Sequence, residues 1–147
     1  MDSVGRKIFT HDVPPSIVPN PEGDVFFITI NTLPRGTNQL AVTEVWERII
    51  ESIQIREANH DLRCSLLLAM PDHLHGLFQF PGEKPMKKAI ASFKSWLAKS
   101  KGIRWQRDFF DHRLRNTESA AEKAHYIRMN PVRAGLCEKP EDWPYQR

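Results

Sequence analysis

Two pairs of residues have types and spacings that could support chemistry, and the first pair is His73 and His75. The alternation of apolar and polar residues around them indicates a strand, so both imidazoles point to the same face of it. Two imidazoles on one face can bind one divalent ion. They can equally form a hydrogen-bonded pair on a half-exposed strand. Their spacing alone leaves both interpretations open.

The second pair, Tyr126 and Asn130, lies in a segment with helical periodicity. Residues four apart share one face of a helix, so this phenol and this amide oxygen can approach the same point. The alternative is that the Tyr126 ring packs in the core while Asn130 caps the helix end before Pro131. The sequence contains 2 tyrosines, so a mechanism that needs a tyrosine has only Tyr145 as a second candidate.

Positive charge is concentrated in the second half of the chain. The 147 residues include 21 Lys and Arg against 18 Asp and Glu, a net charge of +3. Residues 1–80 contain 6 basic and 10 acidic side chains (−4), whereas residues 81–147 contain 15 and 8 (+7). Such a basic half favours a polyanionic partner, and nucleic acid is the first candidate. Aromatic residues alternate with these cations, and we expect most to be core and Trp96 or Trp105 to be free to stack on bases.

The elements that must position these residues follow from hydrophobic periodicity. Strands are predicted at 24–31, 62–70 and 73–80, with a further strand and its exit at 103–114. The continuous apolar run at 62–70 is typical of a central strand buried on both faces. Helices are predicted at 41–58, at 84–101 and from about 116 to 129, where Pro131 would stop the last one.

This order of elements predicts an α+β fold, a ferredoxin-like antiparallel sheet (βαββαβ) with an appended C-terminal helix that carries the tyrosine. Two crossover helices cover one face of such a sheet, so we expect the histidines to point out of the other face. The predicted domain covers residues 24–147, and the proline-rich residues 1–23 are predicted to form an extended arm before it.

Cysteine content and hydropathy exclude several classes of protein. Cys64 and Cys137 lie far apart, which argues against a disulfide framework or a cysteine-based zinc site and fits a reducing cytoplasm. No apolar stretch approaches the roughly 20 residues that cross a bilayer, so we expect no membrane partner. A cytoplasmic protein, associated with the nucleoid when bound to DNA, is the expectation.

Four segments of the sequence resemble a known family. They read MPDHLH at 70–75, WQRDFFDHRLR at 105–115, YIRMNPVRAGL at 126–136 and EDWPY at 141–145. In order and spacing they are similar to the REP-associated tyrosine transposases, in the single-tyrosine branch of the HUH endonuclease superfamily. The resemblance extends from about residue 26 to residue 145. The chain departs from the family at Asp72, where Asn is usual, and in its N-terminal arm.

The resemblance implies a set of residue roles. His73, His75 and Asn130 would be metal ligands, and Tyr126 the nucleophile of a metal-dependent DNA transposase. Such a ligand set suits Mg²⁺ or Mn²⁺. The enzyme would cleave and rejoin single-stranded DNA through a 5′-phosphotyrosine, at hairpin-forming repeats, as a monomer or homodimer. Candidate DNA contacts in the basic half are Lys94, Arg107, Arg113, Arg128 and Arg133.

Two other functions fit parts of the same pattern. A ferredoxin-like sheet with aromatic and basic residues also occurs in RNA-binding domains, so a catalytically inactive, domesticated nucleic-acid-binding module is the main alternative. The chain has no Gly- and aromatic-rich RNA-binding signature, and all four site residues are present. An HUH nickase of plasmid replication or transfer would use the same chemistry, but such proteins resemble different flanking motifs and are usually longer.

Overall fold

The protein is described by a computed structural model that covers residues 23–147 apart from residue 116, without the side chains of residues 117 and 118. The arm predicted at 1–23 therefore lies, except for its last residue, outside the described residues. In chain order the elements are β1 (Phe26–Asn31), α2 (Thr43–Ala58), β2 (Arg63–Met70), β3 (His73–Gln79), α3 (Met86–Lys101), β4 (Phe110–Arg113), α4 (Thr117–Arg133) and the 3-10 helix η3 (Pro140–Asp142).

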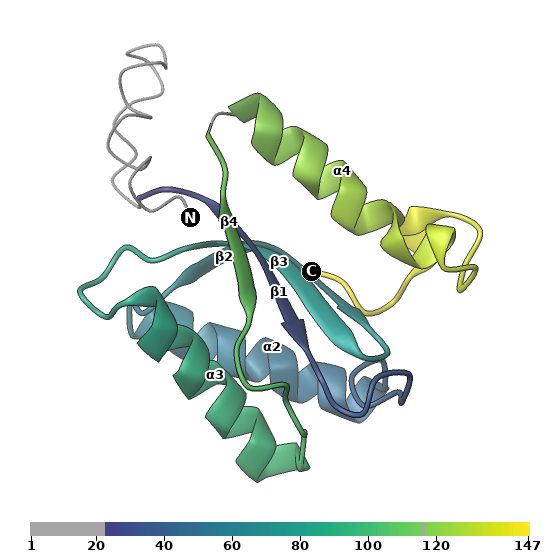
Figure 1. Ribbon diagram of the computed structural model, residues 1–147, viewed down its shortest axis with the longest axis horizontal. Coiled ribbons are helices and arrows are strands. Elements are labelled where there is room, and N and C mark those ends of the chain that lie inside the picture. Colours follow the sequence, from purple (N-terminus) through teal and green to yellow (C-terminus); the bar gives the residue numbers. More distant parts are fainter. Residues whose placement is uncertain (1–22, 116) are drawn as a thin grey trace.

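The four strands form one antiparallel sheet in the order β2-β3-β1-β4. Helices α2 and α3 lie together on one face of the sheet, and α4 crosses the other face (Figure 1). This is the predicted ferredoxin-like α+β fold with an appended helix. The predicted strand at 103–114 is shorter than expected: Phe110–Arg113 forms the strand paired with β1, and Trp105 forms only an isolated bridge with Thr32.

Two hydrophobic clusters occupy the two faces of the sheet. The larger one contains Leu74 and Phe78 of β3 together with buried residues of α2 and α3. The smaller one contains Leu77 of β3 and Ile127 of α4. Because successive side chains of a strand point to opposite faces, His73 and His75 share the face of Leu77 and look toward α4. The alternation predicted for this strand is confirmed.

Strand β2 is an edge strand of the sheet, so the prediction of a central strand is wrong on this point. Its outer edge pairs with the last residues of the chain. The Leu67 N–H donates to the Arg147 carbonyl at 2.9 Å, the Arg147 N–H donates to the Leu67 carbonyl at 2.8 Å, and the Ala69 N–H donates to the Tyr145 carbonyl at 2.9 Å. This pairing covers the edge, which is why an apolar run typical of a central strand is stable here.

Helix α4 continues through Pro131 to Arg133, so the prediction that Pro131 stops it is wrong. Proline has a φ compatible with a helix, and Pro131 lies in the last turn of α4, where the donor that it removes interrupts the helix least. Beyond it, the Ala134 N–H donates to the Asn130 carbonyl at 3.0 Å, and Gly135, at φ 76°, follows the last turn. Asn130 is therefore an internal helical residue in register with Tyr126, rather than a cap.

The cysteines and the hydropathy of the helices can also be compared with the expectations from the sequence. Cys64 is a buried free thiol and Cys137 a half-buried one, as expected without a disulfide framework. Within residues 23–147, no helix has the length and apolar character that spanning a membrane requires.

Candidate active site between β3 and α4

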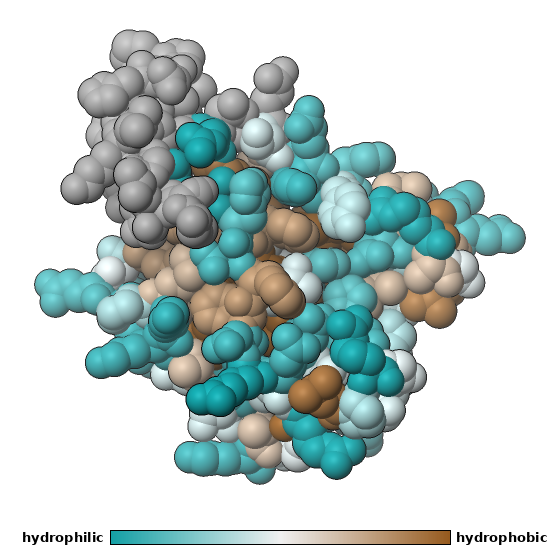
Figure 2. Space-filling model, in the orientation of Figure 1, coloured by the Kyte–Doolittle hydropathy of each residue, from teal (hydrophilic) through white to brown (hydrophobic). Residues whose placement is uncertain are grey.

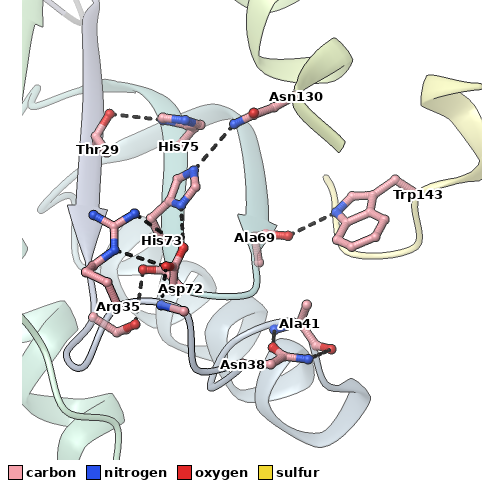
Figure 3. Close-up of polar contacts among 12 residues, drawn as sticks. Thr29, Arg35, Asn38, Ala41, Ala69, Asp72, His73, His75, Asn130 and Trp143 are labelled. Atoms are coloured by element: carbon pink, nitrogen blue, oxygen red, sulfur yellow. Dashed lines mark hydrogen bonds and ion pairs between the residues drawn. The ribbon is translucent and has the colours of Figure 1, made fainter. Parts of the chain in front are cut away.

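His73 begins β3, and its imidazole is contacted from both sides (Figure 3). Its Nδ1 lies 2.9 Å from Oδ1 of Asp72, and its Nε2 lies 3.4 Å from Nδ2 of Asn130 on α4. Partial burial by itself raises the pKa of Asp72, but hydrogen bonds from Arg35, His73 and the Gly36 N–H outweigh it and hold the pKa well below its usual range. Asp72 is therefore an ionised carboxylate next to this imidazole.

His75 is buried and fixed by residues of β1. Its ring stacks on Phe27 with centroids 5.4 Å apart, and its Nδ1 lies 3.0 Å from Oγ1 of Thr29. Burial, and then the charges of His73 and Arg133, lower the pKa of His75 to about 3. The imidazole is thus neutral at physiological pH, the form that binds a metal ion. The rings of His73 and His75 are 4.7 Å apart.

Tyr126 lies on α4 with its ring between the sheet and solvent. Its side chain is 46% exposed, and the ring centroid lies 6.3 Å from that of His75. The guanidinium of Arg133 lies 4.3 Å from this ring centroid and donates to the Tyr126 carbonyl at 2.7 Å. Lys123 places its Nζ 5.6 Å from the same centroid. The phenol is therefore open to solvent and has two cations beside it, unlike a tyrosine packed in the core.

Asn130 is the third residue that could hold a divalent ion together with His73 and His75. Its amide faces Nε2 of His73, and a half-turn of the amide would present Oδ1 there instead, because the two atoms are assigned from the hydrogen-bond network. Two imidazole nitrogens and an amide oxygen suit Mn²⁺ or Mg²⁺. Over the described part of the chain no group of three or more His, Cys, Asp and Glu could hold a metal ion, at this site or elsewhere.

The candidate DNA contacts, by contrast, are not all brought to this face. Arg113 is 1% exposed and lies 3.5 Å from Asp24 in an ion pair, so it is a buried structural residue and its prediction as a DNA contact is wrong. Lys94 belongs to α3, on the face opposite Tyr126. Its Nζ donates to the Gln106 carbonyl at 2.9 Å and to the Asp108 carbonyl at 3.1 Å, so it holds that loop.

The remaining candidates and the aromatic residues are distributed over both sides of the molecule. Arg107 is exposed before β4, and Arg128 and Arg133 are exposed on α4. Trp96 and Trp105 are both packed against the larger cluster, so the expectation that one of them is free is wrong. Phe110 (60% exposed) is more exposed than either tryptophan, and apolar surface gathers over β4 in the middle of Figure 2.

Sequence reasoning missed several residues that contact this site. Lys123 precedes Tyr126 by three positions, so helical spacing was a signal that could have found it. Thr29 lies opposite His75 in the β1–β3 ladder, a pairing that only the sheet reveals. Arg35, which contacts Asp72 from the loop after β1, has no signal in the local sequence.

The fold and the site together define a class of protein. A histidine pair on a strand of a ferredoxin-like sheet faces an exposed tyrosine, with an asparagine one turn further along the same helix. The arrangement is similar to that implied by the resemblance to single-tyrosine HUH proteins.

Comparisons with known proteins find similarity to REP-associated tyrosine transposases. A REP-associated tyrosine transposase of Escherichia coli K12 is 25% identical over 127 residues, which are 84% of this chain and 76% of that protein. A Haemophilus influenzae protein, named as a candidate REP-associated tyrosine transposase, is 26% identical over 142 residues, covering 84% of this chain and 79% of that protein.

A solved structure gives the same result at the level of the fold. A REP-associated tyrosine transposase bound to a REP hairpin matches with a TM-score of 0.74 and 25% identity, covering 84% of this chain and 75% of that one. No family model matches the chain. In sequence and in fold, the protein is similar to the REP-associated tyrosine transposases.

Proposed function

We propose that this protein cleaves and rejoins single-stranded DNA at hairpin-forming repeats through a covalent 5′-phosphotyrosine on Tyr126. The observation that carries the proposal is the exposed phenol of Tyr126, whose ring centroid lies 6.3 Å from that of His75. Asn130 of the same helix contacts His73. The hairpin bound to the solved homologue supports hairpin DNA as the substrate.

In the proposed reaction the Tyr126 oxygen attacks a backbone phosphorus and the bond from phosphorus to the 3′ oxygen breaks. The phenol loses a proton, and the departing 3′ oxygen gains one and leaves as a hydroxyl. One phosphodiester replaces another, so a later attack by a 3′-hydroxyl on the phosphotyrosine can rejoin DNA without ATP. The same exchange on a second DNA end transfers the strand.

His73, His75 and Asn130 are the residues that would hold a divalent ion, Mg²⁺ or Mn²⁺. When bound there, the ion would polarise a phosphoryl oxygen and orient the scissile phosphate. Arg133 and Lys123 both lie over the Tyr126 ring. They provide fixed positive charge where an anionic phosphate must approach the phenol. Lys123 thus joins Arg107, Arg128 and Arg133 as a proposed phosphate contact.

The test uses a REP hairpin with single-stranded flanks, labelled and incubated with the protein and Mg²⁺ or Mn²⁺. We expect a covalent protein–DNA adduct on a denaturing gel with the wild type and none with Tyr126→Phe. Tyr145→Phe is the matched control, because the Tyr145 ring packs on Trp143 (5.4 Å) and Trp46 (6.4 Å) and should not be needed.

The outcomes separate the two candidate functions. An adduct that persists in Tyr126→Phe would contradict the assignment of the nucleophile. Tight hairpin binding by the wild type without adduct or cleaved strand, with either metal, would instead support the inactive nucleic-acid-binding module. Binding by Tyr126→Phe at wild-type affinity shows that the variant is folded and has lost only the chemistry.

A further inference from the structure

Asp72 lies just before β3, and its carboxylate contacts hydrogen-bond donors from three residues (Figure 3). The Arg35 guanidinium donates from Nε to Oδ2 at 3.0 Å and from Nη2 to Oδ1 at 3.4 Å. The backbone N–H of Gly36 donates to Oδ2 at 2.8 Å. On the other side, Oδ1 lies 2.9 Å from Nδ1 of His73. Both carboxylate oxygens are therefore engaged, which fixes the plane of the group.

The backbone on either side of this carboxylate is also anchored. The carbonyl of Asp72 accepts the N–H of Thr32 at 2.9 Å and the Thr32 hydroxyl at 3.0 Å. These bonds join the turn between β2 and β3 to the end of β1, and they involve no side-chain atom of Asp72. Substituting the carboxylate should therefore leave the turn in place and change only what the carboxylate holds.

We propose that Asp72, clamped by Arg35, is a positioning residue that fixes His73 as the Nδ1–H tautomer and turns its Nε2 lone pair toward Asn130. A carboxylate can only accept hydrogen bonds, so the ring nitrogen next to it must be the donor. A neutral imidazole has one such proton, and the opposite nitrogen then carries the lone pair. That nitrogen is the one 3.4 Å from Asn130.

Arg35 has a role that can be separated from folding. Its side chain is 51% exposed, and an ion pair at such a surface contributes little to stability. Asp72 is 16% exposed and His73 17% exposed, so the clamp lies where the surface meets the site. The geometry predicts that loss of Arg35 disturbs His73 rather than the fold. As far as metal binding is concerned, the inference rests on the proposed function.

The first measurement is the affinity of the full chain for Mn²⁺. The free ion is detected by its electron paramagnetic resonance signal during a titration. We expect Asp72→Ala to weaken binding by roughly 10- to 100-fold, and Arg35→Ala by roughly tenfold, as is usual for groups that orient a metal-bound histidine. Arg35→Lys keeps the charge without the planar fork and should fall between Arg35→Ala and the wild type. Arg35→Ala and Arg35→Lys should unfold at the wild-type temperature, because Arg35 forms a surface ion pair.

The matched control is Arg48→Ala. Arg48 is 40% exposed and forms a surface ion pair with Glu51 at 3.1 Å on α2, so its loss removes the same charge and the same kind of contact far from β3. We expect its Mn²⁺ affinity to equal that of the wild type. Asp72→Ala or Arg35→Ala binding Mn²⁺ as tightly as the wild type would overturn the proposal.

The second measurement needs no metal. Long-range ¹H–¹⁵N spectra of the metal-free protein at pH 8, where an ordinary imidazole is neutral, report which nitrogen of His73 carries the proton. We expect Nδ1–H in the wild type and a mixture of tautomers in Asp72→Ala and Arg35→Ala. A wild-type proton on Nε2 would overturn the positioning role. The expected tautomers in a protein that binds no Mn²⁺ would keep that role and overturn the metal-dependent function instead.

Discussion

The two tyrosines of this chain have the same chemistry and opposite surroundings. Tyr126 is 46% exposed, with Arg133 and Lys123 close to its ring. The Tyr145 ring packs between Trp46 and Trp143, and its backbone carbonyl accepts a hydrogen bond from β2. Only the first can meet a phosphate without rearrangement of the core, so at the scale of single residues the reactive phenol is selected by exposure and by neighbouring cations.

Burial also gives Cys64 a measurable pH dependence. Burial, with a smaller contribution from Glu57 and against the effect of Arg147, raises the pKa of this thiol from 9.0 to about 12. Between these values the unfolded chain loses the proton while the folded chain keeps it. The free energy of unfolding must therefore fall as the pH rises through this window, by up to about 1.4 kcal/mol per pH unit from this group.

We expect Cys64→Ala to flatten this dependence. Urea denaturation at pH 8, 9.5 and 11 should show a smaller loss of stability for the variant than for the wild type. Cys137→Ala, at a half-buried position near the surface, is the control and should change the slope less. Identical slopes for the wild type and Cys64→Ala would contradict the burial argument.

At the scale of elements, the position of α4 depends on the smaller of the two hydrophobic clusters. Ile127 is fully buried there, between the exposed residues Tyr126 and Arg128 on the same helix. It contacts a cluster supplied by β2, β3 and Trp143. Its burial helps to set the rotation of the helix about its axis, and with it the direction in which Tyr126 and Asn130 face β3.

Ile127→Ala should lower the free energy of unfolding by about 2–4 kcal/mol, because it leaves a cavity under α4. Amide hydrogen exchange in α4 should increase more than exchange in α2 and α3, since the two clusters lie on opposite faces of the sheet. Ile53→Ala, at an equally buried position of the larger cluster, is the control. Ile53→Ala should destabilise the protein without a selective increase of amide exchange in α4. The same exchange pattern in Ile53→Ala and Ile127→Ala would argue against separate clusters.

At the scale of the whole molecule, the net charge of +3 conceals an uneven distribution. The described cations near the candidate site include Lys123 and Arg133 beside Tyr126, with Arg128 exposed on the same helix. Lys94 and Arg113 belong to the same basic half of the sequence but are held by a loop and by Asp24. The field that a DNA strand would meet therefore depends on which cations the fold leaves exposed.

Salt dependence of hairpin binding should report this distribution. Each phosphate contact with a single strand adds about 0.7 to the slope of log affinity against log salt, so Arg128→Ala should reduce the slope by about 0.7. Arg48→Ala on α2 removes the same charge from the opposite face and should leave the slope unchanged. Equal reductions in both variants would mean that net charge, and not the α4 surface, governs binding.

Much of the fold was predictable because its signals are local. The 3.6-residue period of the helices and the alternation of residues 73–80 arise from contacts within each element, and they predict the βαββαβ order and the shared face of the two histidines. The spacing of Tyr126 and Asn130 placed both on one helix face for the same reason. The motifs around these residues also suggested the family that the comparisons support.

Contacts between distant parts of the chain decided the rest. The sequence by itself determined the elements, the His73–His75 pair and the Tyr126–Asn130 face, because short-range periodicity specifies them. Only the tertiary structure decided that Arg113 is buried against Asp24 and that Arg35 clamps Asp72 beside His73. These roles depend on which side chains meet across the sheet and its loops, and burial and partner geometry are not encoded in the spacing of any one segment.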